Sequence, residues 1–360
     1  MYNYLYDKST EPTTVTILIN FYYLMSNLKK ILIGKKNCKS VWFMRQAGRY
    51  LPEFKRIRED NKNFINLCLN SELSSEITLQ PIKRFNLDSA IIFSDILMVP
   101  YALGQSVKFV KEQGPILDSF NLEKFLDNTK NSFTENLQPV YKAIEITKKK
   151  LDQNKSLISF IGAPWTLLIY ILGAKKNKNE LEHEKIKSQE AKINIILDKL
   201  IEYLCVHIEN QIQAGADVVQ IFDSWAGLLS TKDLPNYCYV PNRKIVEFCI
   251  NKNIPTICFP RGIGENYKNF NNIVKADGIN LDYDIDPLWA KQNLKNVVLQ
   301  GGLDPKTLLL SNEEIKSKAS EYFNIFKDIP YIFNLGHGLL PETDPDKVDM
   351  LIKFYREYKL

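Results

Sequence analysis

Short apolar runs recur along the chain and alternate with longer segments in which apolar residues follow a helical period. Eight such runs occur, at residues 41–44, 89–93, 157–161, 218–222, 255–259, 278–281, 297–300 and 331–334. Most of them are continuously apolar, which is typical of parallel strands that are covered on both faces. The pattern therefore predicts eight buried parallel strands.

The segments between these runs predict helices. Residues 193–214 carry apolar side chains at helical spacing, among them Ile196, Leu200, Leu204 and Ile208. Two later helices are expected to begin at Asn312 and at Asp344, because both are N-capping residue types with acidic residues close behind them.

The alternation of strand and helix favours one fold class. Eight strand–helix units predict an α/β protein with a single closed (β/α)8 TIM-type barrel rather than a doubly wound sheet. No glycine-rich dinucleotide-binding fingerprint follows any of the strands. Residues 101–154 hold a further strand-like run, at 107–110, together with helices, and we interpret them as an insertion around the mouth of the barrel.

A polar residue follows nearly every predicted strand. In chain order these residues are Arg45 and Arg49, Asp95, Tyr170, Ser224, Arg261, Asp282, Asp304 and His337. In a barrel the carboxyl ends of all strands open on the same face, where such proteins place their active sites. The sequence therefore predicts one polar pocket on an apolar scaffold.

Composition sets mild limits on function. Of 360 residues, 45% are hydrophobic, and 47 basic against 42 acidic residues leave a net charge of +5. So small an excess does not argue for a nucleic-acid partner, and the lysine tracts at 148–150 and 175–176 indicate solvated helix faces. Six cysteines without paired spacing predict no disulfide framework, which fits the reducing cytoplasm. Cys205 and Cys258 lie in apolar runs and are expected to be buried.

The first 24 residues stand apart from the rest. Their apolar run at 15–24 is too short to span a bilayer as a helix, and it lacks the flanking features of a signal peptide. We therefore expect no membrane association. We interpret residues 1–24 as an N-terminal extension that is disordered or a start-site artefact, and residues 25–360 as a single barrel domain, since no linker divides them.

Metal and phosphate motifs are missing from the sequence. The chain has three histidines, His183, His207 and His337, and no His-x-His, His-Glu-x-x-His, paired-cysteine or Walker motif. These observations favour a reaction without metal or cofactor. His183 and His207 lie in helical patterns and are expected at the surface or only partly packed.

The segment 42–54 concentrates cationic chemistry that is rare elsewhere. Its sequence is WFMRQAGRYLPEF, and its two arginines stand four residues apart although the chain has only eight arginines against 39 lysines. Gly48 permits a close backbone approach or a positive φ, and Pro52 indicates a loop. Two guanidiniums on a loop at a strand end form a clamp for carboxylate or phosphate. An ordinary pair of surface arginines is the alternative.

This segment resembles a signature of the uroporphyrinogen decarboxylase family, and the likeness extends along the chain. Five further stretches are similar to motifs of that family and occur in the same order: AIIFSDIL at 90–97, GAPWTL at 162–167 followed by Tyr170, FDSWAG at 222–227, LQGGLDP at 299–305 and NLGHG at 334–338. The resemblance spans residue 26 to the C-terminus.

The resemblance implies a specific activity. Members of this family are carboxy-lyases that convert the four acetate side chains of uroporphyrinogen III to methyl groups, giving coproporphyrinogen III and CO2 in haem biosynthesis without a cofactor. It also implies a cytoplasmic homodimer that needs neither nucleic acid nor a membrane.

The resemblance also assigns roles to residues of this chain. It places Arg45, Asp95 and Tyr170 in catalysis, with Asp95 contacting the pyrrole N–H groups and balancing positive charge on the pyrrole. It assigns His337 to a substrate carboxylate. The substrate-binding set that it implies is Arg45, Gln46, Ala47, Gly48, Arg49, Asp95, Tyr170, Ser224 and His337.

Ordinary structural roles remain open for most of these side chains. Asp95 could cap a helix, and Ser224 could cap the segment that follows it. Tyr170 could belong to the core, and His337 could be a structural loop residue. Arg261 and Asp304 are interpreted as possible ion-pair partners at the barrel rim and are not assigned to catalysis.

Two other kinds of protein remain open for the chain as a whole. One is a corrinoid-dependent methyltransferase on the same barrel, which would hold zinc through histidine and cysteine at the rim. The other is a non-catalytic tetrapyrrole-binding protein.

Overall fold

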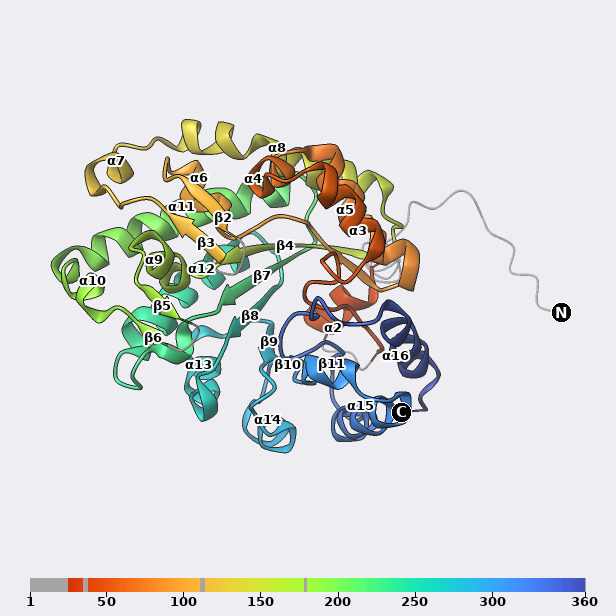
Figure 1. The fold of residues 1–360 in the computed structure, drawn as a ribbon. Coiled ribbons are helices and arrows are strands. Elements are labelled where there is room, and N and C mark those ends of the chain that lie inside the picture. The colour runs from red at the N-terminus through yellow and green to blue at the C-terminus, as the bar shows by residue number, and fades with distance from the viewer. Residues whose placement is uncertain (1–24, 35–37, 111–113, 178–179, 360) are drawn as a thin grey trace, which may run out of the picture.

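A curled parallel sheet forms the centre of the protein. The computed structural model describes residues 25–34, 38–110, 114–177 and 180–359, and the expectation for residues 1–24 lies outside this part. Seven strands pair in parallel in the order β1-β4-β7-β8-β9-β10-β11, with helices arranged outside them (Figure 1). They are β1 (Ser89–Ile91), β4 (Ser156–Gly162), β7 (Val218–Asp223), β8 (Thr256–Pro260), β9 (Gly278–Leu281), β10 (Val298–Gly301) and β11 (Tyr331–Ile332). The predicted parallel α/β architecture is confirmed.

The segment around Val41 lies between the two edges of this sheet. On one side Val41 forms a parallel bridge with Phe333, the Trp42 N–H donates to the Phe333 carbonyl (3.3 Å), and the Phe333 N–H donates to the Ser40 carbonyl (2.9 Å). On the other side the Asp88 N–H donates to the Val41 carbonyl (3.1 Å), and the Asp88 carboxylate accepts from the Val41 N–H (2.7 Å). The predicted strand 41–44 is therefore a single bridge, because a carboxylate replaces a backbone partner at one edge.

Fifteen α-helices, four 3-10 helices and one π-helix are found in the described part of the chain. The α-helices are α2 (Asn27–Gly34), α3 (Pro52–Asp60), α4 (Phe64–Cys68), α5 (Ser71–Phe85), α6 (Met98–Ala102), α7 (Leu122–Leu126), α8 (Lys130–Lys150), α9 (Pro164–Ile171), α10 (His183–Lys187), α11 (Ile193–Gln213), α12 (Val240–Asn251), α13 (Tyr267–Val274), α14 (Pro287–Asn293), α15 (Asn312–Phe326) and α16 (Pro345–Glu357). The 3-10 helices are η1 (Glu190–Lys192), η2 (Ala226–Leu228), η4 (Gly264–Asn266) and η5 (Pro305–Leu309), and the π-helix is η3 (Pro235–Tyr239).

The predicted helix starts are nearly correct. Asp344 is the N-cap of α16, and its carboxylate accepts from the Asp346 N–H. The N-cap of α15 is Ser311 rather than the expected Asn312. The Ser311 hydroxyl accepts from the Glu314 N–H while the Glu314 carboxylate accepts from the Ser311 N–H, and this reciprocal pair satisfies two amide groups that the helix itself leaves unpaired.

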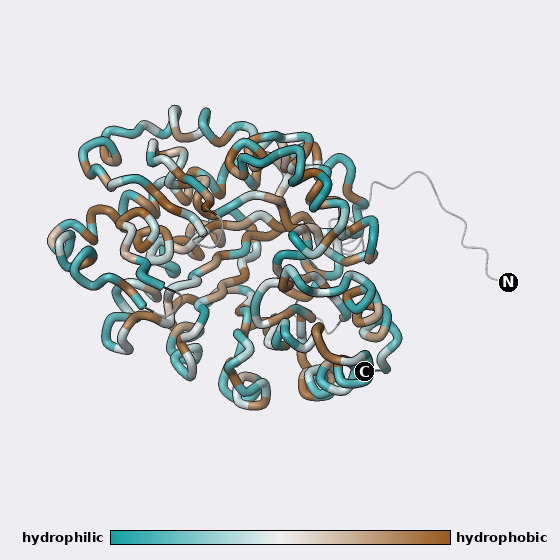
Figure 2. The backbone as a smooth tube through the Cα atoms, viewed as in Figure 1, coloured by the Kyte–Doolittle hydropathy of each residue, from teal (hydrophilic) through white to brown (hydrophobic). Residues whose placement is uncertain are grey.

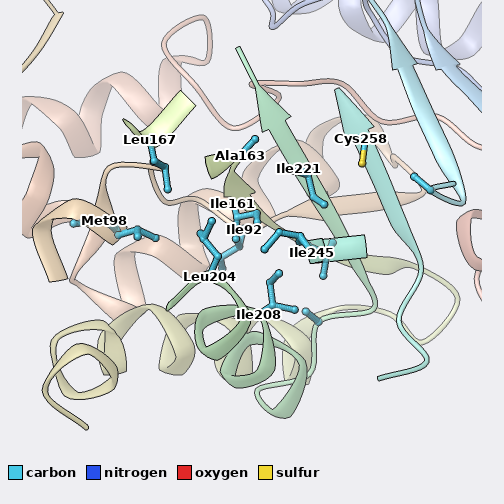
Figure 3. Packing of buried hydrophobic residues seen from close by; sticks show 14 of the residues in the cluster. Ile92, Met98, Ile161, Ala163, Leu167, Leu204, Ile208, Ile221, Ile245 and Cys258 are labelled. Atoms are coloured by element: carbon cyan, nitrogen blue, oxygen red, sulfur yellow. The ribbon is translucent and has the colours of Figure 1, made fainter. Parts of the chain in front are cut away.

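The main core lies between the outer face of the sheet and the helices. Ile161 of β4 and Ile221 of β7 point toward Leu204 and Ile208 of α11 (Figure 3), and all four side chains are buried. Burial of each such side chain contributes about 1.5–3 kcal/mol relative to exposure. Apolar residues accordingly concentrate on the strands, while polar residues are frequent on the outer helices (Figure 2).

A second buried cluster joins α2 to the inner face of the sheet. It comprises Leu28, Ile31, Leu32, Trp42, Met44, Ile91, Ile158, Val218, Ile257, Phe259, Val298 and Ile332. Val218, Ile257 and Val298 lie within the first two residues of their strands. Helix α2 therefore covers the amino end of the curled sheet, and the carboxyl end is left to the loops.

The expected insertion contains a separate hairpin. The predicted strand at 107–110 is confirmed as β2 (Val107–Val110), which pairs in antiparallel fashion with β3 (Gly114–Leu117) outside the main sheet. Gln105, just before β2, donates from its side chain to the Ile171 carbonyl at the end of α9 (2.9 Å). A second hairpin follows α9 and consists of β5 (Lys175–Asn177) and β6 (Glu180–Leu181).

Two features bear on the environment of the protein. None of the six cysteines forms a disulfide within the described ranges, and Cys258 is buried as expected, but Cys205 is only half-buried. None of the described helices is both long and apolar enough to cross a membrane.

His207 is buried, whereas the sequence pattern predicted a place at the surface or only partial packing. It lies on α11 facing α8, where its Nδ1 is 3.0 Å from the Tyr141 hydroxyl and its Nε2 is 3.0 Å from the Gln211 amide nitrogen. Burial lowers the pKa of His207 to about 3, so the ring is neutral in the folded protein. The sequence pattern indicates this burial, because position 207 stands three residues after Leu204 on the apolar face of α11.

We expect His207 to make the protein sensitive to acid. Its folded pKa of about 3 lies below the unfolded value of 6.5, so its contribution is complete above pH 6.5 and is lost as the pH falls toward 3. The loss between pH 7 and pH 5 should be about 2 kcal/mol. Urea denaturation at pH 7 and pH 5 measures the free energy of unfolding. Between these pH values it should fall by about 2 kcal/mol less in His207→Gln than in the wild type. Equal pH dependence in the two proteins would contradict this assignment, since all other groups titrate in both.

Candidate active site

The loop that carries Arg45 and Arg49 is tightly folded. Arg45 has a φ of 61°, a left-handed conformation that non-glycine residues rarely adopt. A Cβ at Gly48 would lie 2.9 Å from the Arg45 carbonyl oxygen, so the glycine is needed for close approach and not for a positive φ. The Met44 N–H donates to the Asn334 side-chain oxygen (3.1 Å), which fixes the start of the loop to the end of the sheet.

The arginine loop lies against the last loop of the sheet. The Leu339 N–H donates to the Met44 carbonyl (2.9 Å), and any side chain at Gly338 would overlap the aliphatic part of Arg45. His337, the residue before this glycine, is half-buried, and its Nδ1 accepts from the Gly338 N–H (2.6 Å). The structure thus brings Arg45 next to the loop of His337, although the two residues lie at opposite ends of the chain.

Arg45 is surrounded by the charged and titratable groups that the sequence singled out. Its side chain reaches solvent, yet the surrounding protein lowers its pKa, and Arg49 and Arg261 lower it further. Asp95 and Tyr170 act in the opposite direction. Neither Arg45 nor Arg49 forms an ion pair with a carboxylate in the described part of the chain. Two closely spaced guanidiniums are therefore left with unused hydrogen-bond donors.

Asp95 is held on the loop after β1. One of its carboxylate oxygens accepts from the Leu97 N–H (2.9 Å), and the Phe93 N–H, just before it, donates to the Thr78 hydroxyl of α5 (2.8 Å). The N-cap position of α6 is Leu97, so Asp95 stabilises the turn before the helix and is not itself the cap. Burial raises the pKa of Asp95 to about 6, and the Leu97 N–H and Arg45 oppose this rise.

Tyr170 and Ser224 lie on neighbouring elements. Tyr170, near the end of α9, is half-buried, and its ring meets that of Trp225 edge to face with 5.9 Å between centroids. Burial, followed by the charge of Asp95, raises the pKa of Tyr170 to about 12, so it keeps its proton at neutral pH. Ser224 is half-buried in the turn directly after β7 and precedes Trp225. Tyr170 is thus neither fully in the core nor remote from Asp95.

Gln46 supports the arginine loop from inside. Its side chain is fully buried, accepts from the Phe43 N–H (3.0 Å) and donates to the Ser89 carbonyl at the start of β1 (2.9 Å). Its own carbonyl accepts from the Tyr50 hydroxyl (3.0 Å). The side chain is therefore occupied within the protein, and a contact with any ligand would have to come from the backbone. Ala47, the next residue, is half-buried.

A cationic hollow of about 590 Å³ adjoins Arg49. It is lined by Arg49, Phe54, Lys55, Arg58, Glu59 and Lys62. The additional cations were not selected from the sequence. Lys55 and Arg58 stand three residues apart on α3 and therefore share a face of that helix, while Lys62 follows its end.

Other rim residues have structural partners. The Asp282 carboxylate accepts from the Gly262 N–H (2.7 Å) and the Asp284 N–H (3.1 Å), and Asp304 caps η5 through the Lys306 N–H (2.8 Å). The suggested ion pairs of Arg261 and Asp304 are not formed among the described residues. No group of three or more histidine, cysteine, aspartate or glutamate side chains in the described ranges is arranged to hold a metal ion.

The fold and the site together define a parallel α/β protein whose strand-end loops carry an arginine pair beside a half-buried carboxyl group. A solved methyltransferase from Methanosarcina mazei has this fold, with a TM-score of 0.73, 16% identity, and coverage of 92% of this chain and 97% of that one. The chain belongs to the uroporphyrinogen decarboxylase family, whose model, described as "Uroporphyrinogen decarboxylase (URO-D)", matches residues 34–358.

Similar proteins support this membership along nearly the whole chain. A uroporphyrinogen decarboxylase of Orientia tsutsugamushi (strain Ikeda) is 41% identical over 337 residues, which cover 90% of this chain and 96% of that protein. A uroporphyrinogen decarboxylase of Rickettsia canadensis (strain McKiel) is 39% identical and covers 93% of this chain and 100% of its own length.

We expect Gln46→Leu to destabilise the protein. The substitution keeps most of the volume but leaves the Phe43 N–H and the Ser89 carbonyl unpaired in the interior, which should lower the free energy of unfolding by about 2–4 kcal/mol. Arg49→Leu, an exposed change on the same loop, should stay within about 0.5 kcal/mol. Urea denaturation measures both. If the two variants unfold at the same urea concentration, the side chain of Gln46 does not support the loop.

Proposed function

We propose that this protein is a uroporphyrinogen decarboxylase that converts the four acetate side chains of uroporphyrinogen III to methyl groups. The observation that carries this proposal is the pair Arg45 and Arg49, which form no ion pair with a carboxylate in the described ranges, together with Asp95, a carboxyl group with a raised pKa that interacts with Arg45. Membership in the family supplies the reaction, and the geometry of this chain fits the charge that the substrate carries.

The substrate is a polyanion with eight carboxylates. A guanidinium binds a carboxylate through two parallel N–H donors, so two adjacent arginines can fix two of its arms. We infer that His337, next to Arg45, and Ser224 bind further carboxylates. The backbone of residues 46–48 completes the contacts, while the side chain of Gln46 holds the loop in place. The cationic hollow beside Arg49 supports attraction of a polyanion to this face.

Each decarboxylation breaks the bond between the methylene carbon and the carboxylate carbon. CO2 leaves, the bonding electron pair remains on the methylene carbon, and a proton is taken up to form the methyl group. When the attached pyrrole ring is protonated first, the ring accepts this electron pair, and it releases the added proton once the methylene carbon has been protonated. The net reaction consumes one proton, and no external electron sink is needed.

Asp95 is suited to stabilise the pyrrole cation. As a carboxylate it would accept hydrogen bonds from the pyrrole N–H groups and oppose their positive charge, and its position is fixed before substrate arrives by the Leu97 N–H. Tyr170 keeps its proton and can donate a hydrogen bond near Asp95. Arg45 interacts with both Asp95 and Tyr170 and therefore acts on the same pyrrole ring of the substrate.

The proposal extends to architecture and environment. We infer that residues 40–44 act as the eighth strand position and close a (β/α)8 barrel, because they hydrogen-bond to both edges of the sheet. Residues 25–360 would then form one domain. From the family resemblance we infer a homodimer in the cytoplasm, where free thiols are stable. Sedimentation equilibrium of the purified protein tests the dimer.

The direct test is an assay with uroporphyrinogen III under reducing conditions, in which products are separated by their number of carboxylates. We expect products with seven, six, five and four carboxylates to form without added metal, pyridoxal phosphate or nicotinamide.

Asp95→Asn keeps the size of the side chain and removes its charge. Turnover should fall by at least about a hundredfold, as for the loss of one strong electrostatic contact. Near-normal turnover in a folded variant would remove Asp95 from the mechanism.

We expect Arg45→Lys and Arg49→Lys each to fold and to lose catalytic efficiency by about tenfold or more, because lysine lacks the planar two-pronged donor set. The KM of the wild type should rise with ionic strength, and the variants should show a shallower rise. Arg243→Lys, on α12 and paired with Glu247, is the matched control and should behave as the wild type. Equal efficiency and equal salt dependence in all four proteins would mean that the arginine pair is an ordinary surface feature.

A further inference from the structure

Thr166 connects two elements that carry candidate site residues. It lies fully buried in the first turn of α9. Its hydroxyl donates to the Asp223 carboxylate at the end of β7 (2.7 Å) and accepts from the Trp225 N–H in the turn that follows (3.2 Å). The partners are 57 and 59 residues away in the sequence.

Other contacts tie the same helix to the same turn. The Ala163 N–H, at the N-cap of α9, donates to the Phe222 carbonyl (2.9 Å), and the Trp165 indole N–H donates to the Trp225 carbonyl (3.2 Å). At the other end of α9, Tyr170 meets the ring of Trp225. All these contacts reach residues 222–225, so α9 is joined to the turn after β7 at both of its ends.

The Asp223 carboxylate is fully used by this arrangement. Its second oxygen accepts from the Asn242 side-chain N–H of α12 (3.0 Å), which also donates to the Cys238 carbonyl (2.8 Å). A buried carboxylate is costly unless its oxygens are hydrogen-bonded. The Trp225 backbone N–H can only donate and the Asp223 carboxylate can only accept, so the Thr166 hydroxyl donates to Asp223 and accepts from Trp225.

We propose that Thr166 is a positioning residue for catalysis, which sets the place of the Tyr170 hydroxyl relative to Ser224 by joining Asp223 to Trp225. Tyr170 stands four residues after Thr166, on the same face of the helix. Ser224 stands between the two residues that the Thr166 hydroxyl contacts. This inference rests on the proposed decarboxylase function, in which Tyr170 and Ser224 face the substrate.

The test uses three variants of buried threonines. Thr166→Val removes the hydroxyl at almost constant volume, and Thr166→Ser retains it. Thr147→Val is the matched control, since Thr147 is also fully buried in a helix but donates only within that helix, to the Ala143 carbonyl (2.7 Å). We expect Thr166→Val to lower kcat by about ten- to a hundredfold with little change in KM, as for a misplaced catalytic group. The kcat of Thr166→Ser and that of Thr147→Val should stay within about threefold of the wild-type value.

A double-mutant cycle separates positioning from general destabilisation. If Thr166 acts through Tyr170, Thr166→Val should lower kcat by less than about threefold in a Tyr170→Phe background, because coupled residues are not additive. The same loss in both backgrounds would overturn the proposal. If Thr166→Val does not fold, Thr166→Ala takes its place in the cycle and is judged by the same outcomes.

A second measurement does not depend on turnover. The chain has four tryptophans, so labelling with 15N-tryptophan gives four backbone amide signals. Hydrogen exchange at the Trp225 N–H should be about tenfold faster or more in Thr166→Val and unchanged in Thr166→Ser and Thr147→Val. Unchanged exchange in Thr166→Val would overturn the proposed link. Failure of the wild type to decarboxylate uroporphyrinogen would instead contradict the proposed function and leave this exchange result intact.

Discussion

The structure depends on the hydrogen bonds that hold the segment around Val41 between the two edges of the sheet. Backbone groups of residues 40–42 pair with Phe333 on one side, and Asp88 holds Val41 on the other. Without these bonds the two edges of the seven-stranded sheet would not be linked to each other. The arginine loop and the loop of His337 would then not be held side by side. With them, the arginine loop lies on the loop of His337, and Arg45 packs over Gly338.

This arrangement concentrates unfavourable features at one place. A left-handed φ at Arg45 costs on the order of 1–3 kcal/mol, and the charges of Arg49 and Arg261 repel the same guanidinium. The rest of the protein compensates through a well-packed core and through buried supports such as Gln46. Local conflicts of this kind are expected at functional sites, where groups are kept ready for a ligand and not for each other.

The sequence predicted the arrangement of strands well because parallel strands that are buried on both faces are continuously apolar and end in polar residues. It also predicted which loops would meet, since the carboxyl ends of such strands share one face of the sheet. It could not predict the direction of an individual side chain. Gln46 belongs to the arginine motif but points into the interior, and His207 was expected near the surface although α11 buries it against Tyr141. Thr166 lies within the motif at 162–167, but the sequence assigned it no role, because its partners are more than fifty residues away and no local pattern records them.

The hydrogen bonds of residues 40–42 to Phe333 also determine when the two ends of the sheet can be linked during synthesis of the protein. Trp42 must wait for Phe333, which the ribosome adds roughly 15–60 s later at about 5–20 residues per second. Until then β1 and the growing far edge of the sheet present unpaired backbone groups, which are templates for association with other chains. Joining such distant residues also requires a large loop-closure entropy, so this step is expected to come late. The nascent chain is therefore expected to expose these edges until Phe333 has left the ribosome, and only after that can the arginine loop reach its folded position.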